Sequence, residues 1–211
     1  MSKSVYSVIL DDDLVVKLDQ VAFENGVSRS VMLDKILANY LTVETPTVRM
    51  ENIFQEVERL VNNYSGLRFV NQASNSMVSV QSSLVYKYRP TVRYVVGLYP
   101  EGELLGVIKI SLRSQSPALF AVMNEFYSFF VKMEKKYVGP RKYTFEDGKF
   151  CRELKRPENL STTDIGTQIA NYVRLFDLFL NGYIKNYENA EEELLYIESE
   201  FAAKYGSKIL I

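Results

Sequence analysis

Histidine does not occur in this chain of 211 residues, and cysteine occurs once, at Cys151. Without histidine the chain lacks the commonest general base and the commonest transition-metal ligand. A single cysteine excludes an intramolecular disulfide framework, and it also excludes zinc sites built from several Cys and His side chains. Glycine-rich phosphate-binding loops and nucleophile elbows are missing as well. We therefore predict that the protein is not an enzyme and carries no metal and no cofactor.

Long apolar runs are missing too, since none reaches about 18 residues, the length that begins to span a bilayer. The N-terminus shows no secretory-signal pattern, so we expect a cytoplasmic protein without a membrane segment. Hydrophobic residues still make up 47% of the chain, which is enough for a packed core. A chain of this length accommodates one ordinary domain and one small module.

Charge is balanced over the whole chain, with 25 basic and 26 acidic residues, but it is unevenly distributed. Residues 1–48 hold 4 basic and 7 acidic residues, residues 49–150 hold 14 and 9, and residues 151–211 hold 7 and 10. A strongly basic arm is therefore lacking. Because neutralisation of phosphates dominates most affinity for DNA, the N-terminal segment alone would bind DNA weakly. It would need the middle segment or a multimer.

The first forty residues carry the clearest pattern. Residues 5–10 combine β-branched and aromatic side chains between polar neighbours, which predicts a strand. Asp11, Asp12 and Asp13 follow directly, where an aspartate can cap a helix and suit its dipole. Apolar residues then recur at helical spacing, at Leu14, Leu18, Val21 and Ala22. Gly26 is expected to end this helix.

A second helix is predicted directly afterwards, with Ser28 or Ser30 as its cap. Its buried stripe is expected to comprise Leu33, Ile36, Leu37, Tyr40 and Leu41. One strand and two helices are too little chain to bury their own apolar surface. We therefore expect this segment to fold by pairing with a second copy.

The spacing of these features over residues 3–42 resembles the ribbon-helix-helix family of DNA-binding proteins. In that family two strands pair antiparallel across a dimer and enter the major groove, and amides at the start of the second helix clamp a phosphate. The resemblance implies a homodimer formed through residues 5–41 and a double-stranded DNA partner. It assigns DNA contacts to Lys3, Val5, Ser7, Ile9, Ser28, Arg29 and Ser30.

The sequence departs from that family at the positions facing the groove. Base edges are recognised by hydrogen-bond donors and acceptors, and here only Ser7 offers them. Val5 and Ile9 could contact thymine methyl groups, and Lys3 a phosphate. Alternatively, the outer face of the strand is covered by protein or serves dimerisation alone. Residues 28–30 likewise have a second interpretation, as an ordinary helix cap.

The rest of the chain predicts an α+β domain. Residues 42–47, with Pro46, indicate a linker, so the predicted units are 1–44 and 49–211. A helix is expected over residues 53–64, ended by Gly66. Strands are expected over residues 67–70, 77–80, 84–88, 92–99 and 104–112, as an antiparallel meander covered by helices.

The C-terminal helices are indicated by caps and by apolar spacing. A helix beginning at Pro117 carries an apolar stripe from Phe120 to Met133, whereas residues 138–160 look irregular. Ser161 and Asp164 resemble a capping box and precede a long helix that carries Ile165, Ile169, Val173 and Phe176. A last helix is expected over about residues 190–205, with inward Leu194, Leu195, Ile197 and Phe201.

Two features of this domain could serve binding. In the stretch from Tyr86 to Tyr94, aromatics alternate with cations, so Lys87, Arg89 and Arg93 could form a secondary nucleic-acid surface; an ordinary amphipathic strand is the alternative. The many aromatics, 15 Tyr and 12 Phe, fit core packing and a subunit interface better than a ligand pocket. A protein partner or a small ligand for this domain therefore stays open.

The leading hypothesis is a homodimeric DNA-binding protein that acts as a transcriptional regulator and can form higher oligomers. A second is an accessory DNA-binding factor of a plasmid or another mobile element, at a transfer origin or a partition site. A third is a dimeric interaction scaffold that does not bind DNA.

Overall fold

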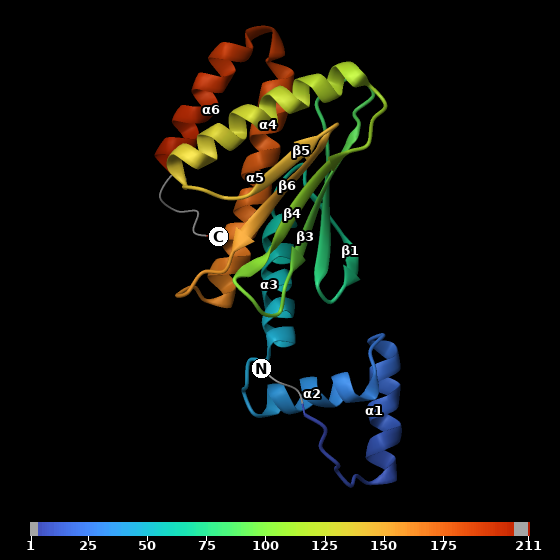
Figure 1. The fold of residues 1–211 in the computed structure, drawn as a ribbon. Helices are drawn as coiled ribbons and strands as arrows, with labels where there is room; N and C mark the ends of the chain where they lie inside the picture. The colour runs from blue at the N-terminus through green and yellow to red at the C-terminus, as the bar shows by residue number, and fades with distance from the viewer. Residues whose placement is uncertain (1–3, 205–210) are drawn as a thin grey trace. The chain divides into compact units, whose positions relative to one another are not determined.

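A computed structural model describes residues 4–204 and residue 211 (Figure 1). The chain divides into two compact units, Met1–Arg49 and Met50–Ile211. The described residues form six α-helices and six strands, a mixed α+β fold. The predicted linker is shorter than expected, because α3 (Pro46–Val61) already begins at Pro46. Proline is well suited to a first helical position, where its missing N–H is no loss.

The first unit contains a helical hairpin of α1 (Asp12–Glu24) and α2 (Arg29–Tyr40). Gly26 ends α1 as predicted, with a φ of 62°. Its N–H donates to Phe23 O and the N–H of Val27 donates to Ala22 O, each at 3.0 Å, which is a Schellman motif. Val27 then packs on a small core of Leu18, Ala22 and Met32.

The strand predicted over residues 5–10 is not present, because residues 4–11 form neither helix nor strand in the single chain. The physical reason is that a strand needs a partner for its backbone N–H and C=O groups, and none of the six strands of the sheet pairs with this segment. Asp11 precedes α1 without a side-chain cap bond, whereas Asp12 and Asp13 occupy its first turn. The acidic start of α1 thus acts through the helix dipole.

The second unit is built on one antiparallel sheet with the strand order β1-β2-β3-β4-β6-β5. Its first four strands follow one another as a meander: β1 (Arg68–Ser74), β2 (Met77–Ser83), β3 (Thr91–Leu98) and β4 (Leu104–Leu112). In the register, Arg93 of β3 lies opposite Gln81 of β2 and Ser111 of β4. The predicted antiparallel sheet is confirmed.

The strand predicted over residues 84–88 is wrong, because this segment is the loop between β2 and β3. Tyr88 and Arg89 both have positive φ, 63° and 44°, which is incompatible with an extended strand. The N–H of Leu84 donates to Pro90 O at 2.9 Å and closes the loop.

The segment predicted to be irregular instead contains a hairpin of β5 (Tyr143–Glu146) and β6 (Lys149–Lys155). Asp147 and Gly148 connect the two strands with φ of 47° and 72°. Two successive positive φ values define the type I′ turn that suits the twist of a hairpin, and Asp-Gly is one of its preferred sequences. Strand β6 adds to β4, so the hairpin extends the meander by two strands.

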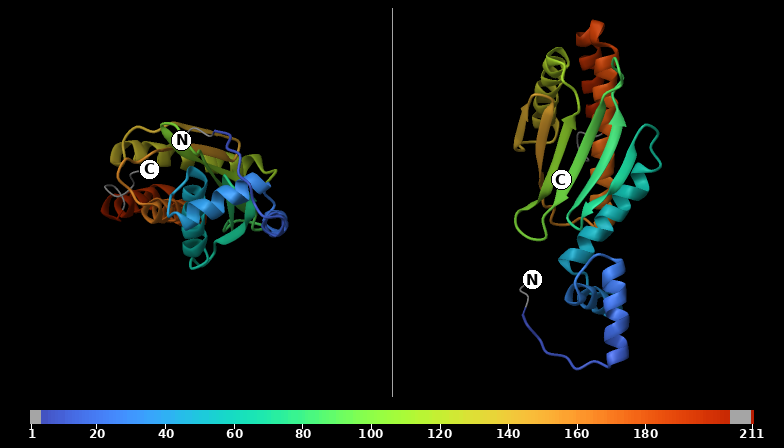
Figure 2. Two further views of the ribbon diagram at one scale, coloured as in Figure 1. Left: turned by 90° about the horizontal axis from the view of Figure 1, so that it is seen from below. Right: turned by 90° about the vertical axis from the view of Figure 1, so that its right-hand side faces the viewer.

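Helices α3, α4 (Pro117–Tyr137) and α5 (Thr162–Lys185) complete the core, and α6 (Ala190–Lys204) packs against α4 and α5. The predicted capping box of α5 is present, with Asp164 N–H donating to Ser161 Oγ at 3.1 Å. Aromatic rings fill the interior: the ring centroid of Phe176 lies 4.7 Å from that of Phe130 and 5.1 Å from that of Phe150. The right-hand view of Figure 2 shows the strands in front and α5 behind them.

One carboxylate is held among hydroxyl groups between the sheet and α5. Asp177 Oδ1 accepts hydrogen bonds from Ser82 Oγ at 2.5 Å and from Tyr94 Oη at 2.7 Å. Burial raises the pKa of the Asp177 carboxyl above its ordinary value of 3.8, and the two hydroxyl groups oppose that rise. Nearby, Asn181 Oδ1 accepts from the Val85 N–H at 2.8 Å and anchors the loop.

We expect Asp177→Asn to change the pH dependence of stability. In wild type the folded carboxyl binds a proton more tightly than the unfolded one. Its contribution therefore becomes less favourable as pH rises from about 4 through the raised pKa. Asparagine keeps the acceptor without the charge. The free energy of unfolding of the variant, measured in urea, should therefore increase relative to that of wild type over this pH range. Asp177→Leu should instead lose about 1–3 kcal/mol, because two hydroxyl groups lose their acceptor. Identical pH profiles for wild type and Asp177→Asn would contradict this account.

Candidate nucleic-acid interface

The start of α2 leaves two backbone amides without a hydrogen-bond partner among the described residues. Ser28 is the N-cap, and its Oγ accepts from the Val31 N–H at 3.4 Å. Within the described residues, no hydrogen bond satisfies the amides of Arg29 and Ser30. Free amides at a helix N-terminus, with the positive end of the dipole, suit a phosphate. Ser28 and Ser30 thus lie at the start of the second helix, as predicted from the sequence, and both are exposed.

Arg29 has a partner that the sequence did not indicate. Its Nε donates to Asp19 Oδ1 at 2.6 Å and its Nη2 to Asp19 Oδ2 at 2.5 Å, a bidentate pair between α2 and α1. Hydrogen bonding from Arg29 lowers the pKa of the Asp19 carboxyl. The pair is solvent-exposed, so screening makes it a weak brace. A phosphate that bound the same Nε and Nη2 of Arg29 would have to displace Asp19.

The residues predicted to face the groove are fully available to solvent. Val5 is 98% exposed and Ile9 is 100% exposed, and Ser7 is exposed between them. Lys3 lies outside the described residues. The nearly full exposure of Val5 and Ile9 means that the single chain does not pack them on the start of α2, and the ribbon that would align them requires a second strand.

Many large apolar side chains of the first unit are exposed to solvent in the single chain. The stripe predicted for the second helix is mostly exposed in the single chain, up to 85% at Tyr40, and only Leu33 packs on the core. On α1, Leu14 and Phe23 are exposed as well. Monomeric proteins rarely expose contiguous apolar patches beyond a few hundred Å². The exposed members are Val5, Tyr6, Val8, Ile9, Leu14, Val16, Val21, Phe23, Ile36, Leu37, Tyr40, Leu41 and Val43.

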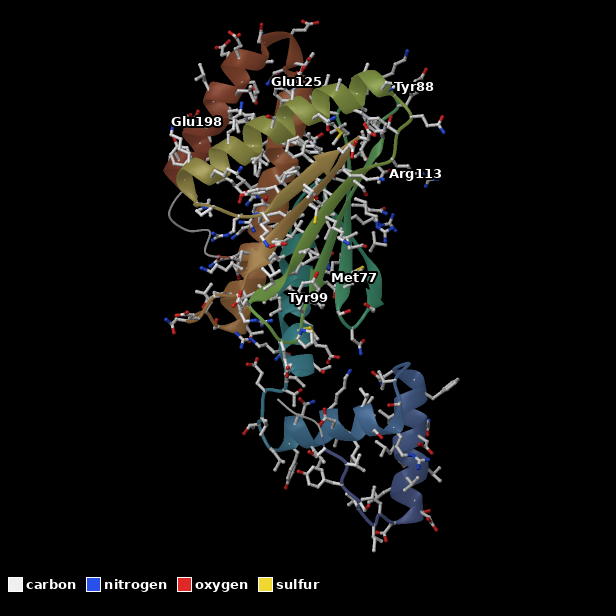
Figure 3. All side chains as sticks on the ribbon, viewed as in Figure 1. Met77, Tyr88, Tyr99, Arg113, Glu125 and Glu198 are labelled. Atoms are coloured by element: carbon white, nitrogen blue, oxygen red, sulfur yellow. The ribbon has the colours of Figure 1, made fainter. Side chains whose placement is uncertain are left out.

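The cations of the secondary surface predicted between Tyr86 and Tyr94 lie on two different elements, a loop and a strand. Lys87 and Arg89 lie in the loop before β3, where the Lys87 ammonium sits 5.2 Å from the ring centroid of Tyr88. Arg93 belongs to β3, and its guanidinium donates to Ser79 Oγ on β2. The aromatics and cations therefore do not alternate along one strand. Figure 3 shows Tyr88 at the end of the sheet near Arg113.

Over the part of the chain that the structure describes, no group of three or more Cys, Asp or Glu is arranged to hold a metal ion. In the same residues, no helix is both long and apolar enough to cross a membrane. No family model matches the chain, and the comparisons with curated proteins and with solved structures find no match either.

Proposed function

We propose that the protein is a homodimeric DNA-binding protein of the ribbon-helix-helix type, acting as a transcriptional regulator. The supporting observation is the uncovered apolar surface of the first unit, which includes both helices and the segment before them. A second copy covers this surface and supplies the antiparallel partner that residues 5–10 lack. The paired strands then present Ser7 to base edges, and the amides of residues 29 and 30 clamp a phosphate.

The first test is the oligomeric state of a stripe variant. Leu37→Glu should convert the dimer to a monomer, because the carboxylate would have to be buried in the interface without a partner. Asn39→Glu adds the same charge to the same helix outside the stripe and should leave the dimer intact. Light scattering after gel filtration measures both. If Leu37→Glu were as dimeric as the control, the predicted interface would be wrong.

The second test is sequence-specific DNA binding, by selecting bound fragments from random DNA at about 50 and 200 mM salt, a range over which phosphate contacts weaken strongly. A palindromic or repeated motif should emerge. Ser7→Ala should lower the preference for that motif about fivefold, since one hydrogen bond contributes ~1 kcal/mol. Selected sites that overlap promoters would fit a repressor, and tandem sites at a transfer origin would fit a mobile-element factor.

The role of Arg29 can be separated from its ion pair in the same assay. Arg29→Ala should weaken binding to all sequences, because a phosphate contact carries no sequence information. Asp19→Asn releases Arg29 and removes a negative charge, so it should bind DNA at least as tightly as wild type. If Asp19→Asn weakened binding as much as Arg29→Ala, Arg29 would serve only as a brace between the helices.

A second candidate function is a dimeric scaffold that does not bind DNA. It is favoured by the apolar Val5 and Ile9 at groove-facing positions and by the acidic balance of residues 1–48. This function predicts a dimer with no salt-dependent affinity for DNA.

A further inference from the structure

The sheet of the second unit has one covered face and one open face. Along β3, Tyr94 and Val96 are buried against the helices, whereas Arg93 between Val92 and Tyr94 is exposed. Along β4, Ile108 and Ile110 are buried and Lys109 is exposed. The right-hand view of Figure 2 looks onto this open face. An antiparallel sheet with one solvent-exposed face is common. Whether this face binds a ligand therefore depends on the side chains that it presents.

Cations from four strands gather on this open face. One row of the register runs Arg68, Gln81, Arg93, Ser111 and Lys149 across β1, β2, β3, β4 and β6. At about 4.8 Å per strand, this row is roughly 19 Å wide. Lys109 lies two residues before Ser111 on β4 and so on the same face of the strand, and Arg113 follows directly after the end of β4 at Leu112.

The surface between these cations is hollowed. One hollow of about 570 Å³ is lined by Arg93, Lys109, Ser111 and Lys149, among others. A second hollow, which shares Arg93 and Ser111 with the first, is also lined by Arg113. Figure 3 shows Arg113 and Met77 on the same side of the sheet. Arg93, Lys109, Arg113 and Lys149 therefore line two adjoining hollows, whereas Arg68 lines neither of them.

The positive charges on this surface outnumber the carboxylates beside them. Within the described residues, none of the five cations Arg68, Arg93, Lys109, Arg113 and Lys149 forms an ion pair. Arg93 instead donates to Ser79 Oγ at 3.0 Å, which fixes its guanidinium over the sheet. Two carboxylates share this face: Glu146 of β5 lies opposite Lys149 in the register and lines the first hollow, and Glu153 lies on β6.

We propose that this face, defined by Arg68, Arg93, Lys109, Arg113 and Lys149, binds the phosphate backbone of double-stranded DNA as a second, sequence-independent contact. The face is too wide for a single small anion, and its five cations outnumber the two carboxylates, Glu146 and Glu153, that share it. Its outward side chains on β2, β3 and β4 are hydroxyls, an amide, cations and small or aliphatic groups, which suit phosphates. They provide no rings for stacking bases, as single-stranded DNA would require. The one exposed ring that lines the first hollow, Phe145, belongs to the edge strand β5. The inference rests on the proposed function in one respect: the first unit is acidic and needs cations from elsewhere.

The position of Cys151 provides a direct test in the unmodified protein. Cys151 is the only cysteine of the chain, lies opposite Lys109 in the register, and lines the first hollow. It is partly exposed. Bound duplex DNA should therefore slow the alkylation of wild-type Cys151 by N-ethylmaleimide several-fold, whereas the same concentration of inorganic phosphate should not.

Charge-removing variants supply the second readout. Arg93→Gln/Lys109→Gln/Lys149→Gln should reduce the slope of log affinity against log salt by about 3, since each lost phosphate contact removes about 0.9. The loss should be the same for selected and random duplexes. Lys132→Gln/Lys135→Gln/Lys185→Gln removes equal charge from exposed positions on α4 and α5 and should leave the slope within about 1 of wild type. Circular dichroism verifies that both variants fold.

The outcomes distinguish the two proposals. One outcome is that a sequence motif is selected while DNA leaves the alkylation rate of Cys151 unchanged and the triple variant of Arg93, Lys109 and Lys149 (the sheet variant) keeps the wild-type salt dependence of affinity. In that case the open face does not bind DNA and the ribbon function stands. If Ser7→Ala has no effect while the sheet variant loses binding, the face binds DNA and the ribbon does not recognise sequence. Equal losses in the sheet and helix variants would show a general charge effect and overturn the inference. No duplex binding by wild type at about 50 mM salt would overturn both proposals.

Discussion

Arg152→Met should destabilise the protein by about 3–5 kcal/mol, because it leaves Glu134 charged and unpaired inside the second unit. Both side chains are completely buried, and Arg152 Nε donates to Glu134 Oε1 at 2.9 Å. Tyr172 Oη donates to the other carboxylate oxygen at 2.9 Å. Arg152 Nη2 also donates to the main-chain oxygen of Ile211 at 2.9 Å, so the same substitution removes that hydrogen bond as well.

A double variant separates the pair from the space that it fills. Glu134→Gln/Arg152→Met removes both charges and keeps an acceptor for Tyr172, so it should be more stable than Arg152→Met alone. Unfolding in urea, followed by circular dichroism because the chain has no tryptophan, measures the difference. A single variant within about 1 kcal/mol of wild type would show that Glu134 is neutral or solvated in the folded protein.

Gly106→Ala should prevent folding or destabilise the sheet by at least about 3 kcal/mol, the upper end for overpacking. A Cβ atom there would lie 2.0 Å from the carbonyl oxygen of Gly97 and 2.9 Å from Leu98 Cα. Both obstacles are backbone atoms of β3, which cannot rotate away. Gly106 lies at the irregularity where β4 departs from regular pairing with β6, a typical role for glycine in a strand.

Gly97→Ala is the matched control on the neighbouring strand. Its Cβ would meet Val107 Cγ2 at 3.7 Å, an ordinary van der Waals contact. We expect it to change stability by about 1 kcal/mol or less, as for other tolerated substitutions. Soluble yield and urea unfolding compare the two. Equal stabilities for Gly106→Ala and Gly97→Ala would contradict the close approach of β3 and β4 at Gly106.

The helices of this fold could be predicted from local signals. Gly26 ends α1, Ser28 caps α2, and Ser161 with Asp164 opens α5, because caps and turns depend on neighbouring residues alone. It was harder to predict which face of a helix is buried. Leu195 was expected to be buried but is 70% exposed, since apolar spacing on a peripheral helix does not say which turn meets the core.

The hairpin of β5 and β6 was missed because a charged residue occupies an inward position. Every second residue of β6, namely Phe150, Arg152 and Leu154, points toward the core. Because Arg152 is charged, the alternation of apolar and polar residues that indicates a strand is interrupted in the sequence. The burial of Arg152 is explained by distant partners: Glu134, eighteen residues earlier on α4, and the main-chain oxygen of Ile211 accept its hydrogen bonds. The Asp-Gly turn was the local signal that could have revealed this hairpin. The pairing of Asp19 with Arg29 and the row of cations on the open face are likewise set by tertiary register.

Under the proposed dimer, the strand predicted over residues 5–10 depends on a second molecule, whereas the small core around Leu18, Ala22 and Met32 is already buried within one chain. Under the proposed dimer, folding of the first unit is bimolecular, so its melting temperature should rise with protein concentration. DNA that binds only the paired form would add to this stability by mass action. A cell holding few copies would then contain mainly unassembled N-terminal units, and occupancy of the operator would rise as a threshold rather than in proportion to synthesis.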